Sequence, residues 1–170
     1  MSETQPMRPS ARLDALLEYF PTVQLPVTLT DETHLEFSSA NEPLPSLLIE
    51  QFILPYELEE FDDMTEYIAC FRIPETHDFH AIVIWRAGLM SYTYSLMTFT
   101  KKGELIDKRV IAGTFYDGTH LTQSVATIDE DWEILVMTGQ TTGNERYNPA
   151  NSRVTRLELL PEGQIIENIV

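Results

Sequence analysis

The chain has only one cysteine, Cys70, and no long hydrophobic run. A single thiol cannot form an intramolecular disulfide, so the fold must depend on its core, as is usual in a reducing compartment. The longest apolar stretches, such as residues 81–85, are far shorter than the roughly 20 residues that a membrane-spanning helix needs. No charged segment followed by an apolar one stands at the N-terminus, so no export signal is expected. These absences predict a cytoplasmic protein that does not span a membrane.

Lysine and arginine are also scarce, and in one region they are missing. The 170 residues include 11 lysines and arginines against 27 aspartates and glutamates, which gives a net charge of −16. No basic residue lies between Arg12 and Arg72, where there are 13 acidic residues, while the rest of the chain has 11 basic and 14 acidic residues. A strongly negative protein repels phosphate backbones and anionic lipids, so neither nucleic acid nor a membrane surface is an expected partner.

Sequence motifs typical of catalysis or cofactor binding are absent as well. The seven glycines are scattered, and none forms a glycine-rich loop of the kind that holds nucleotide phosphates. No Gly-x-Ser-x-Gly turn presents a nucleophile. Cys70 falls inside a strand pattern, where it is expected to be a small packing residue. We therefore expect no catalytic residue and no cofactor, and we favour a protein that is not an enzyme.

Length and composition predict one α+β, mostly β domain over residues 1–170. The apolar fraction of 43% is typical of globular chains, and 170 residues suffice for one core. Residues 1–10 are expected to be flexible, 11–66 to form an acidic helix-and-loop region, and 67–170 to form the β body. We expect this body to be an antiparallel meander curled into a sandwich, an open barrel or an incomplete propeller-like sheet, with short N-terminal helices against it. The sequence indicates no oligomeric state.

Two short helices are predicted in the acidic region. Apolar residues recur at helical spacing between Ser10, the expected N-cap, and Phe20, and Pro21 ends this pattern. A second helix is predicted over 46–54, with Ser46 as its cap. Prolines interrupt the segment between the two helices, so only short extended pieces are expected there. These pieces are residues 27–29 and 34–37.

From Tyr67 onward, runs of β-branched and aromatic residues alternate with turn residues, which is typical of an antiparallel meander. Both faces of segment 79–87 are apolar, which predicts a central strand covered on both sides. In segment 90–100 the apolar positions change parity after Leu96, which predicts a bulge there that helps to curl the sheet. The predicted strands are 67–73, 79–87, 90–100, 105–112, 121–128, 132–141, 153–160 and 164–170.

One acidic segment mixes carboxylates with large apolar side chains. Acidic residues around an apolar strip are typical of a surface that binds a basic, partly hydrophobic protein. The alternative is that the strip simply covers the sheet. Our leading hypothesis is a non-enzymatic binding protein, of an immunity type or chaperone-like, that engages a basic protein partner. The residues assigned to that contact are Glu57, Glu59, Glu60, Phe61, Asp62 and Asp63.

A rival hypothesis is a metal-dependent hydrolase. Histidine and carboxylate ligands grouped near the end of a sheet can hold a divalent metal. The candidate ligands are His77, Asp78, His80, Asp117 and His120. They would converge only if the loops at 77–80 and 117–120 lay at the same end of the sheet. The alternative is that these are ordinary turn and strand-entry residues.

A third hypothesis is a small-ligand carrier with a hollow β-barrel. If the sheet closes, Trp85, Tyr92, Tyr94 and Phe99 would line a concave, apolar pocket. The alternative is that these aromatic residues form a solid core.

Overall fold

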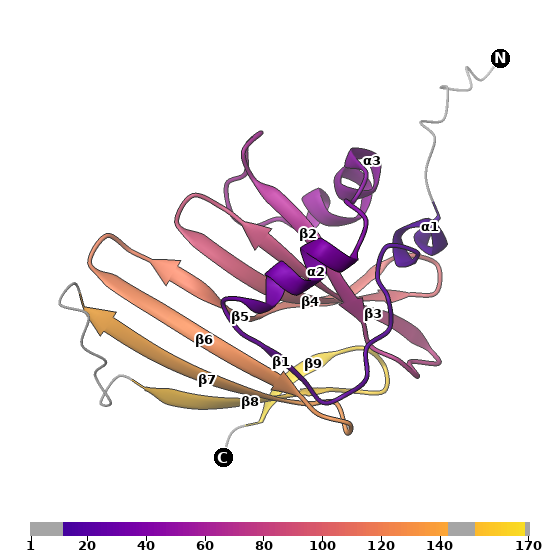
Figure 1. Ribbon diagram of the computed structural model, residues 1–170. Helices are drawn as coiled ribbons and strands as arrows, with labels where there is room; N and C mark the ends of the chain where they lie inside the picture. Colours follow the sequence, from indigo (N-terminus) through magenta and orange to yellow (C-terminus); the bar gives the residue numbers. More distant parts are fainter. Residues whose placement is uncertain (1–11, 143–151, 169–170) are drawn as a thin grey trace.

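Nine antiparallel strands form one sheet in residues 12–142 and 152–168, the part of the chain that the computed structural model describes (Figure 1). The strands are β1 (Val27–Leu29), β2 (Glu66–Arg72), β3 (Phe79–Ala87), β4 (Ser91–Thr100), β5 (Leu105–Tyr116), β6 (His120–Ile128), β7 (Glu133–Thr142), β8 (Arg153–Leu159) and β9 (Ile165–Asn168). Their order in the sheet follows the chain from β2 to β9, and β1 joins by pairing with β6. The predicted fold class, a mostly β antiparallel meander with few short helices, is confirmed.

The helices all precede the meander. They are α1 (Leu13–Leu17), α2 (Thr33–Ala40), α3 (Ser46–Leu48), a π-helix (Ile49–Ile53) and a 3-10 helix (Leu54–Tyr56). The second predicted helix is confirmed, but Pro45 occupies its N-cap position and Ser46 is its first helical residue. The proposed cap Ser10 and the expected flexibility of residues 1–10 lie outside the described residues. No helix in the described part of the chain is long and apolar enough to cross a membrane.

The predicted extended piece at residues 34–37 is wrong, because α2 covers it. The hydroxyl of Thr33 accepts a hydrogen bond from the backbone N–H of Thr30 at 2.9 Å, and this local turn starts the helix. One helical turn then places His34 and Phe37 on the same face. Both rings contact the sheet, and Phe37 packs against Phe71 with ring centroids 5.5 Å apart.

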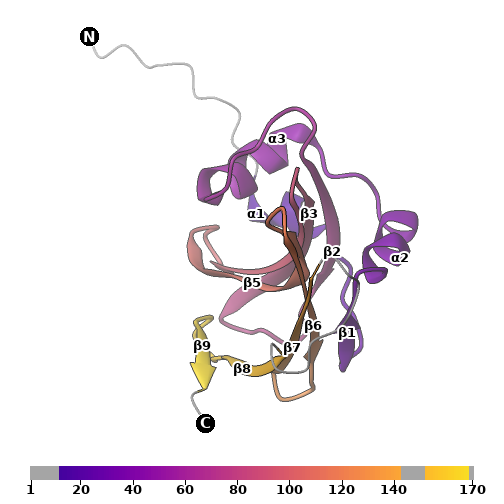
Figure 2. The same cartoon turned by 90° about the vertical axis from the view of Figure 1, so that its left-hand side faces the viewer.

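Strand β3 is covered on both faces, as its sequence predicts, and its neighbour β4 is covered on both faces as well. On one face, α1 and the segment from α3 to the π-helix bury leucine and phenylalanine side chains against Ile82, Ile84 and Met97. On the other face, Val83 and Leu96 belong to a second core to which β1 and strands β5 to β9 contribute. Figure 2 shows α1 and α3 on one side of the sheet and α2 with β1 on the other.

The bulge predicted in β4 is wrong, because the parity change has another cause. The pairing of β3 with β4 runs unbroken from Phe79 with Thr100 to Ala87 with Tyr92. The apolar positions change parity because Leu96 faces one core while Met97 faces the other. The register shifts lie instead between β4 and β5, where β5 carries the extra residues Ile106 and Ile111. Bulges of this kind increase local twist and bend the strand that carries them.

The sheet curls but does not close. Strand β5 pairs with β6 only over Gly113–Tyr116, and β1 pairs with residues 126–128 of β6. Side chains then link the β8–β9 turn back to the first half of the sheet. The Thr98 hydroxyl, which is fully buried, donates to the carbonyl oxygen of Gly163 at 2.6 Å. The carboxylate of Asp107 accepts from the N–H of Ile165 at 2.8 Å. Of the three predicted forms, the open barrel is the nearest description.

We predict that Gly163→Ala destabilises the protein more than Gly118→Ala. Both glycines have a positive φ, +96° and +95°, so both substitutions strain the backbone. A Cβ at Gly163 would lie 2.8 Å from Cδ1 of Ile106 and 3.2 Å from Cγ of Phe79, whereas a Cβ at Gly118 meets nothing within 4 Å. We expect losses of about 2–3 kcal/mol for Gly163→Ala and about 1 kcal/mol for Gly118→Ala in urea unfolding. Equal losses would show that the β8–β9 turn is not packed against Phe79.

Candidate functional site

Arg86 fixes the start of the acidic segment to the sheet. This arginine lies near the end of β3, and only 7% of its surface is exposed. Its Nε donates to Glu57 at 2.9 Å and its Nη1 to Glu59 at 3.1 Å, while Nη2 donates to the backbone carbonyl of Glu60 at 2.6 Å. These three contacts to one guanidinium hold residues 57–60 in a defined conformation.

The ion pair between Arg86 and Glu57 is buried. The side chain of Glu57 is 5% exposed, and it also accepts a hydrogen bond from the hydroxyl of Tyr67 at 2.6 Å. Burial, together with this bond to a carboxylate, raises the pKa of Tyr67 to about 12. Glu57, one of the residues assigned to a partner contact, therefore faces the protein interior. Glu59 is half-exposed and shares the same arginine.

Beyond Glu59 the segment presents apolar side chains to solvent. Leu58 is 97% exposed and Met64 82%, and Phe61 is half-exposed. Leu89, in the β3–β4 turn, is 95% exposed and lines the same shallow depression of about 400 Å³ as Phe61 and Met64. The sequence-predicted residues Glu60, Asp62 and Asp63 are exposed beside them. We call this surface the acidic patch: Leu58, Glu60, Phe61, Asp62, Asp63, Met64 and Leu89.

The turn within the acidic patch has its own hydrogen bonds. The carboxylate of Asp62 accepts from the N–H of Met64 at 2.8 Å, and the hydroxyl of Thr65 accepts from the N–H of Asp62 at 3.1 Å. An Asx turn of this kind fixes the local backbone. Leu89 was absent from the predicted contact residues. The sequence Gly88-Leu89-Met90 could have indicated its exposure, because it places two large apolar residues in a hairpin turn.

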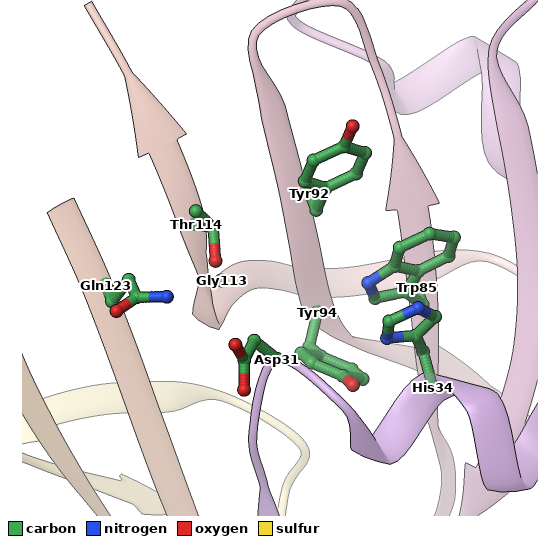
Figure 3. Close-up of a pocket in the computed structure, with 8 residues that line it drawn as sticks. All are labelled: Asp31, His34, Trp85, Tyr92, Tyr94, Gly113, Thr114 and Gln123. Atoms are coloured by element: carbon green, nitrogen blue, oxygen red, sulfur yellow. The ribbon is translucent and has the colours of Figure 1, made fainter. Parts of the chain in front are cut away.

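A second feature is a pocket of about 430 Å³ on the other side of Tyr92 (Figure 3). One wall is a row of aromatic rings. The rings of His34 and Trp85 are stacked with centroids 4.1 Å apart, and Trp85 and Tyr92 lie parallel with centroids 5.8 Å apart. Tyr94 adds a ring whose hydroxyl donates to the carbonyl of Thr30 at 2.8 Å. The polar residues of the lining are Asp31, which lies beside Tyr94, and Thr114 and Gln123.

The pocket carries one negative charge and no positive one. Burial lowers the pKa of His34, so its imidazole is neutral near pH 7. No lysine or arginine lines the pocket, and Asp31 forms no salt bridge within residues 12–142 and 152–168. The lining therefore presents an unpaired, exposed carboxylate next to a row of rings.

The aromatic residues of the third hypothesis are thus divided. Trp85, Tyr92 and Tyr94 line this pocket, whereas Phe99 is fully buried under the helices with Phe52. The pocket is open to one side of the sheet, and the interior between the two halves of the sheet is occupied by the second core. The arrangement is a surface pocket and not the hollow barrel that the sequence suggested.

The five candidate metal ligands do not come together. His77, Asp78 and His80 lie at the end of the sheet where Phe79 pairs with Thr100. Asp117 and His120 lie at the opposite end, beyond the pairing of Phe115 with Ser91. The ten-residue strand β4 separates the two ends by about 30 Å. No group of three or more potential metal ligands occurs among the residues that the structure describes.

Each half of this set has local contacts instead. Asp117 accepts hydrogen bonds from the backbone N–H groups of His120 and Thr119, which lower the pKa of its carboxyl group. The imidazole of His120 lies 3.5 Å from the Asp117 carboxylate. Burial lowers the pKa of His80, and Arg72 acts in the same direction. These contacts are those of turn and strand-entry residues.

No protein-family model, curated protein or solved structure matches this chain, so its function has to be inferred from these surfaces alone.

We predict that Arg86→Met destabilises the protein strongly. The substitution leaves the buried carboxylate of Glu57 without its counter-charge, which costs about 3–5 kcal/mol. Glu59→Gln, which removes only the half-exposed partner, is the matched control and should cost under about 1 kcal/mol. The double variant Glu57→Leu, Arg86→Met should recover much of the loss, because it removes both buried charges. Urea unfolding measures all three, and equal losses for Arg86→Met and Glu59→Gln would contradict the buried pair.

Proposed function

We propose that this protein binds a basic, partly hydrophobic protein partner through the acidic patch and acts as an inhibitor or chaperone of that partner, not as an enzyme. One observation carries the proposal. Met64 and Leu89 are almost fully exposed, and together with Phe61 they line one depression beside Glu60 and Asp62. Clustered apolar side chains on a surface mark interaction sites far more often than single ones do.

The charge around the apolar residues indicates the kind of partner. Glu60, Asp62 and Asp63 form no salt bridge within the described ranges, so their charges are available to a partner. They also lie in the region from 13 to 71, which has 13 acidic residues and no basic one. A field of one sign accelerates the approach of an oppositely charged protein and repels a like-charged one.

The contacts of Arg86 support the same proposal, because they restrict the conformation of the acidic segment before it binds a partner. A loop with exposed apolar residues would lose conformational entropy on binding if it were free to move. Here the guanidinium holds residues 57–60, and the Asx turn holds 62–65. The patch is therefore ordered before a partner arrives. The proposal includes a cytoplasmic location, which the lone, buried cysteine supports.

The first test compares two triple variants that lose the same charge. The patch variant is Glu60→Gln, Asp62→Asn, Asp63→Asn, and the control is Glu104→Gln, Glu130→Gln, Glu162→Gln, three exposed acidic residues on turns of the β body. Each is used as bait in a native lysate at low and at raised salt. We expect a partner that wild type and control retain at low salt and release at raised salt, and that the patch variant fails to retain. A partner kept equally by both variants, or no salt-sensitive partner, would refute the proposal.

A second test measures the binding kinetics with that partner. It separates long-range electrostatic attraction by the carboxylates from direct contact by the apolar side chains. The patch triple variant should lower the association rate constant by about tenfold at low salt, with little effect at high salt. Phe61→Ser, Met64→Ser should instead raise the dissociation rate constant by about tenfold or more, because it removes buried apolar contacts. Surface plasmon resonance over a salt series gives both constants. Unchanged dissociation in the serine variant would contradict the role of the apolar residues.

A further inference from the structure

The pocket beside Trp85 exists because the sheet splits there. Strands β5 and β6 stay paired only near their shared turn, and α2 and the segment before it cover the gap with Asp31 and His34. At the split, β5 carries Gly113, opposite Thr93 of β4. A Cβ at this position would collide with the carbonyl oxygen of Tyr92, and its absence also leaves the floor of the pocket free.

The walls of the pocket are fixed by contacts that need no ligand. The stacked rings of His34, Trp85 and Tyr92 support one another, and the hydroxyl of Tyr94 is tied to the chain before α2. Offset or parallel stacking restricts the orientation of each ring. Preformed, mostly apolar pockets of several hundred Å³ with a few polar groups are the usual sites for small molecules.

The chemistry of the lining favours one class of ligand. Tyr92 is half-exposed, and the faces of tyrosine and tryptophan attract cations. Asp31 lines the same pocket beside Tyr94 as an unpaired carboxylate, and no lysine or arginine lines the pocket to compete for it (Figure 3). Thr114 and Gln123 add neutral polar groups beside Asp31. An anion would meet repulsion from Asp31, and a purely apolar molecule would leave that carboxylate without a partner.

We propose that this pocket binds a small organic cation, with an ammonium or guanidinium group held between Asp31 and the ring of Tyr92 and an apolar or aromatic body against Tyr94 and Trp85. Asp31, His34 and Trp85 do not belong to the acidic patch, and Tyr92 is the residue that lines both depressions. The cation is either a free molecule or the end of a basic side chain of another protein. Both would present the same ammonium or guanidinium group to Asp31 and Tyr92.

The test uses three probes of similar size that differ in charge. They are phenethylammonium, 2-phenylethanol and 3-phenylpropionate, and binding is followed through Trp85 fluorescence in a Trp132→Phe background. Trp85 and Trp132 are the two tryptophans of the chain. We expect saturable binding of the ammonium, at least about tenfold weaker binding of the alcohol, and none of the carboxylate. Equal affinities for the three probes, or no binding of the ammonium at 10 mM concentration, would overturn the proposal.

Two variants test the assigned residues. Asp31→Asn should weaken binding of phenethylammonium by about tenfold and leave the alcohol unaffected. The matched control is Glu32→Gln, which removes the same charge from the next residue, an exposed one that does not line the pocket. Tyr92→Leu should weaken the ammonium more than the alcohol. If Asp31→Asn and Glu32→Gln have the same effect, the cation is drawn only by the general field of the protein, and the site is refuted.

A parallel titration with N-acetyl-arginine amide distinguishes the two sources of the cation. Tighter binding of this probe than of phenethylammonium identifies the end of a basic side chain, and the reverse order identifies a free amine. Because Asp31→Asn leaves the acidic patch intact, its partner binding in the lysate experiment should be unchanged. Loss of the cation site and loss of the proposed partner are therefore separate outcomes.

Discussion

The structure depends on the need to cover both faces of β3 and β4. Their alternate positions bury Ile82 and Met97 on one side and Val83 and Leu96 on the other, so neither side can face water. One cover is made by α1 and by the segment from α3 to the π-helix. The other is made by α2, β1 and the curled second half of the sheet. The curl is thus a consequence of burial, and side chains such as Thr98 hold it without a closed ladder of backbone hydrogen bonds.

Both candidate sites lie where these covers stop, at the end of β3. Trp85 and Arg86 are neighbours in sequence, so they point to opposite faces of the sheet. Arg86 meets the acidic segment on the side covered by α1 and α3, and Trp85 forms the aromatic wall on the side covered by α2. Tyr92, on the adjacent strand, lines both depressions. The end of β3 therefore contributes to both surfaces: Arg86 anchors the acidic segment on one face of the sheet, and Trp85 forms part of the pocket wall on the other face.

The sequence predicts what depends on short-range periodicity and misses what depends on distant pairing. Strand β3 is predicted at its observed bounds, because a short run of apolar and β-branched residues, bounded by turn residues, defines it within nine residues. Helix α2 is missed, since a segment of eight residues flanked by prolines shows barely two turns of pattern. The contact between Arg86 and Glu57 spans 29 residues, and no local pattern announces it. The convergence of Asp31 with Trp85 likewise depends on where β5 and β6 separate.

Acidity alone is an incomplete guide to the surface for which we propose partner binding. The count of 13 acidic residues in region 13–71 treats them as equivalent, yet Glu57 neutralises a buried arginine while Asp62 shapes a turn. Arg86, which lies outside this region in the sequence, pairs with Glu57 and holds the segment in a fixed position on the sheet. Apolar side chains such as Leu58 and Met64 then stay exposed, because the backbone that carries them cannot fold them back onto the sheet. The ion pair that takes Glu57 out of the surface is thus also what holds the chain next to the acidic patch in place.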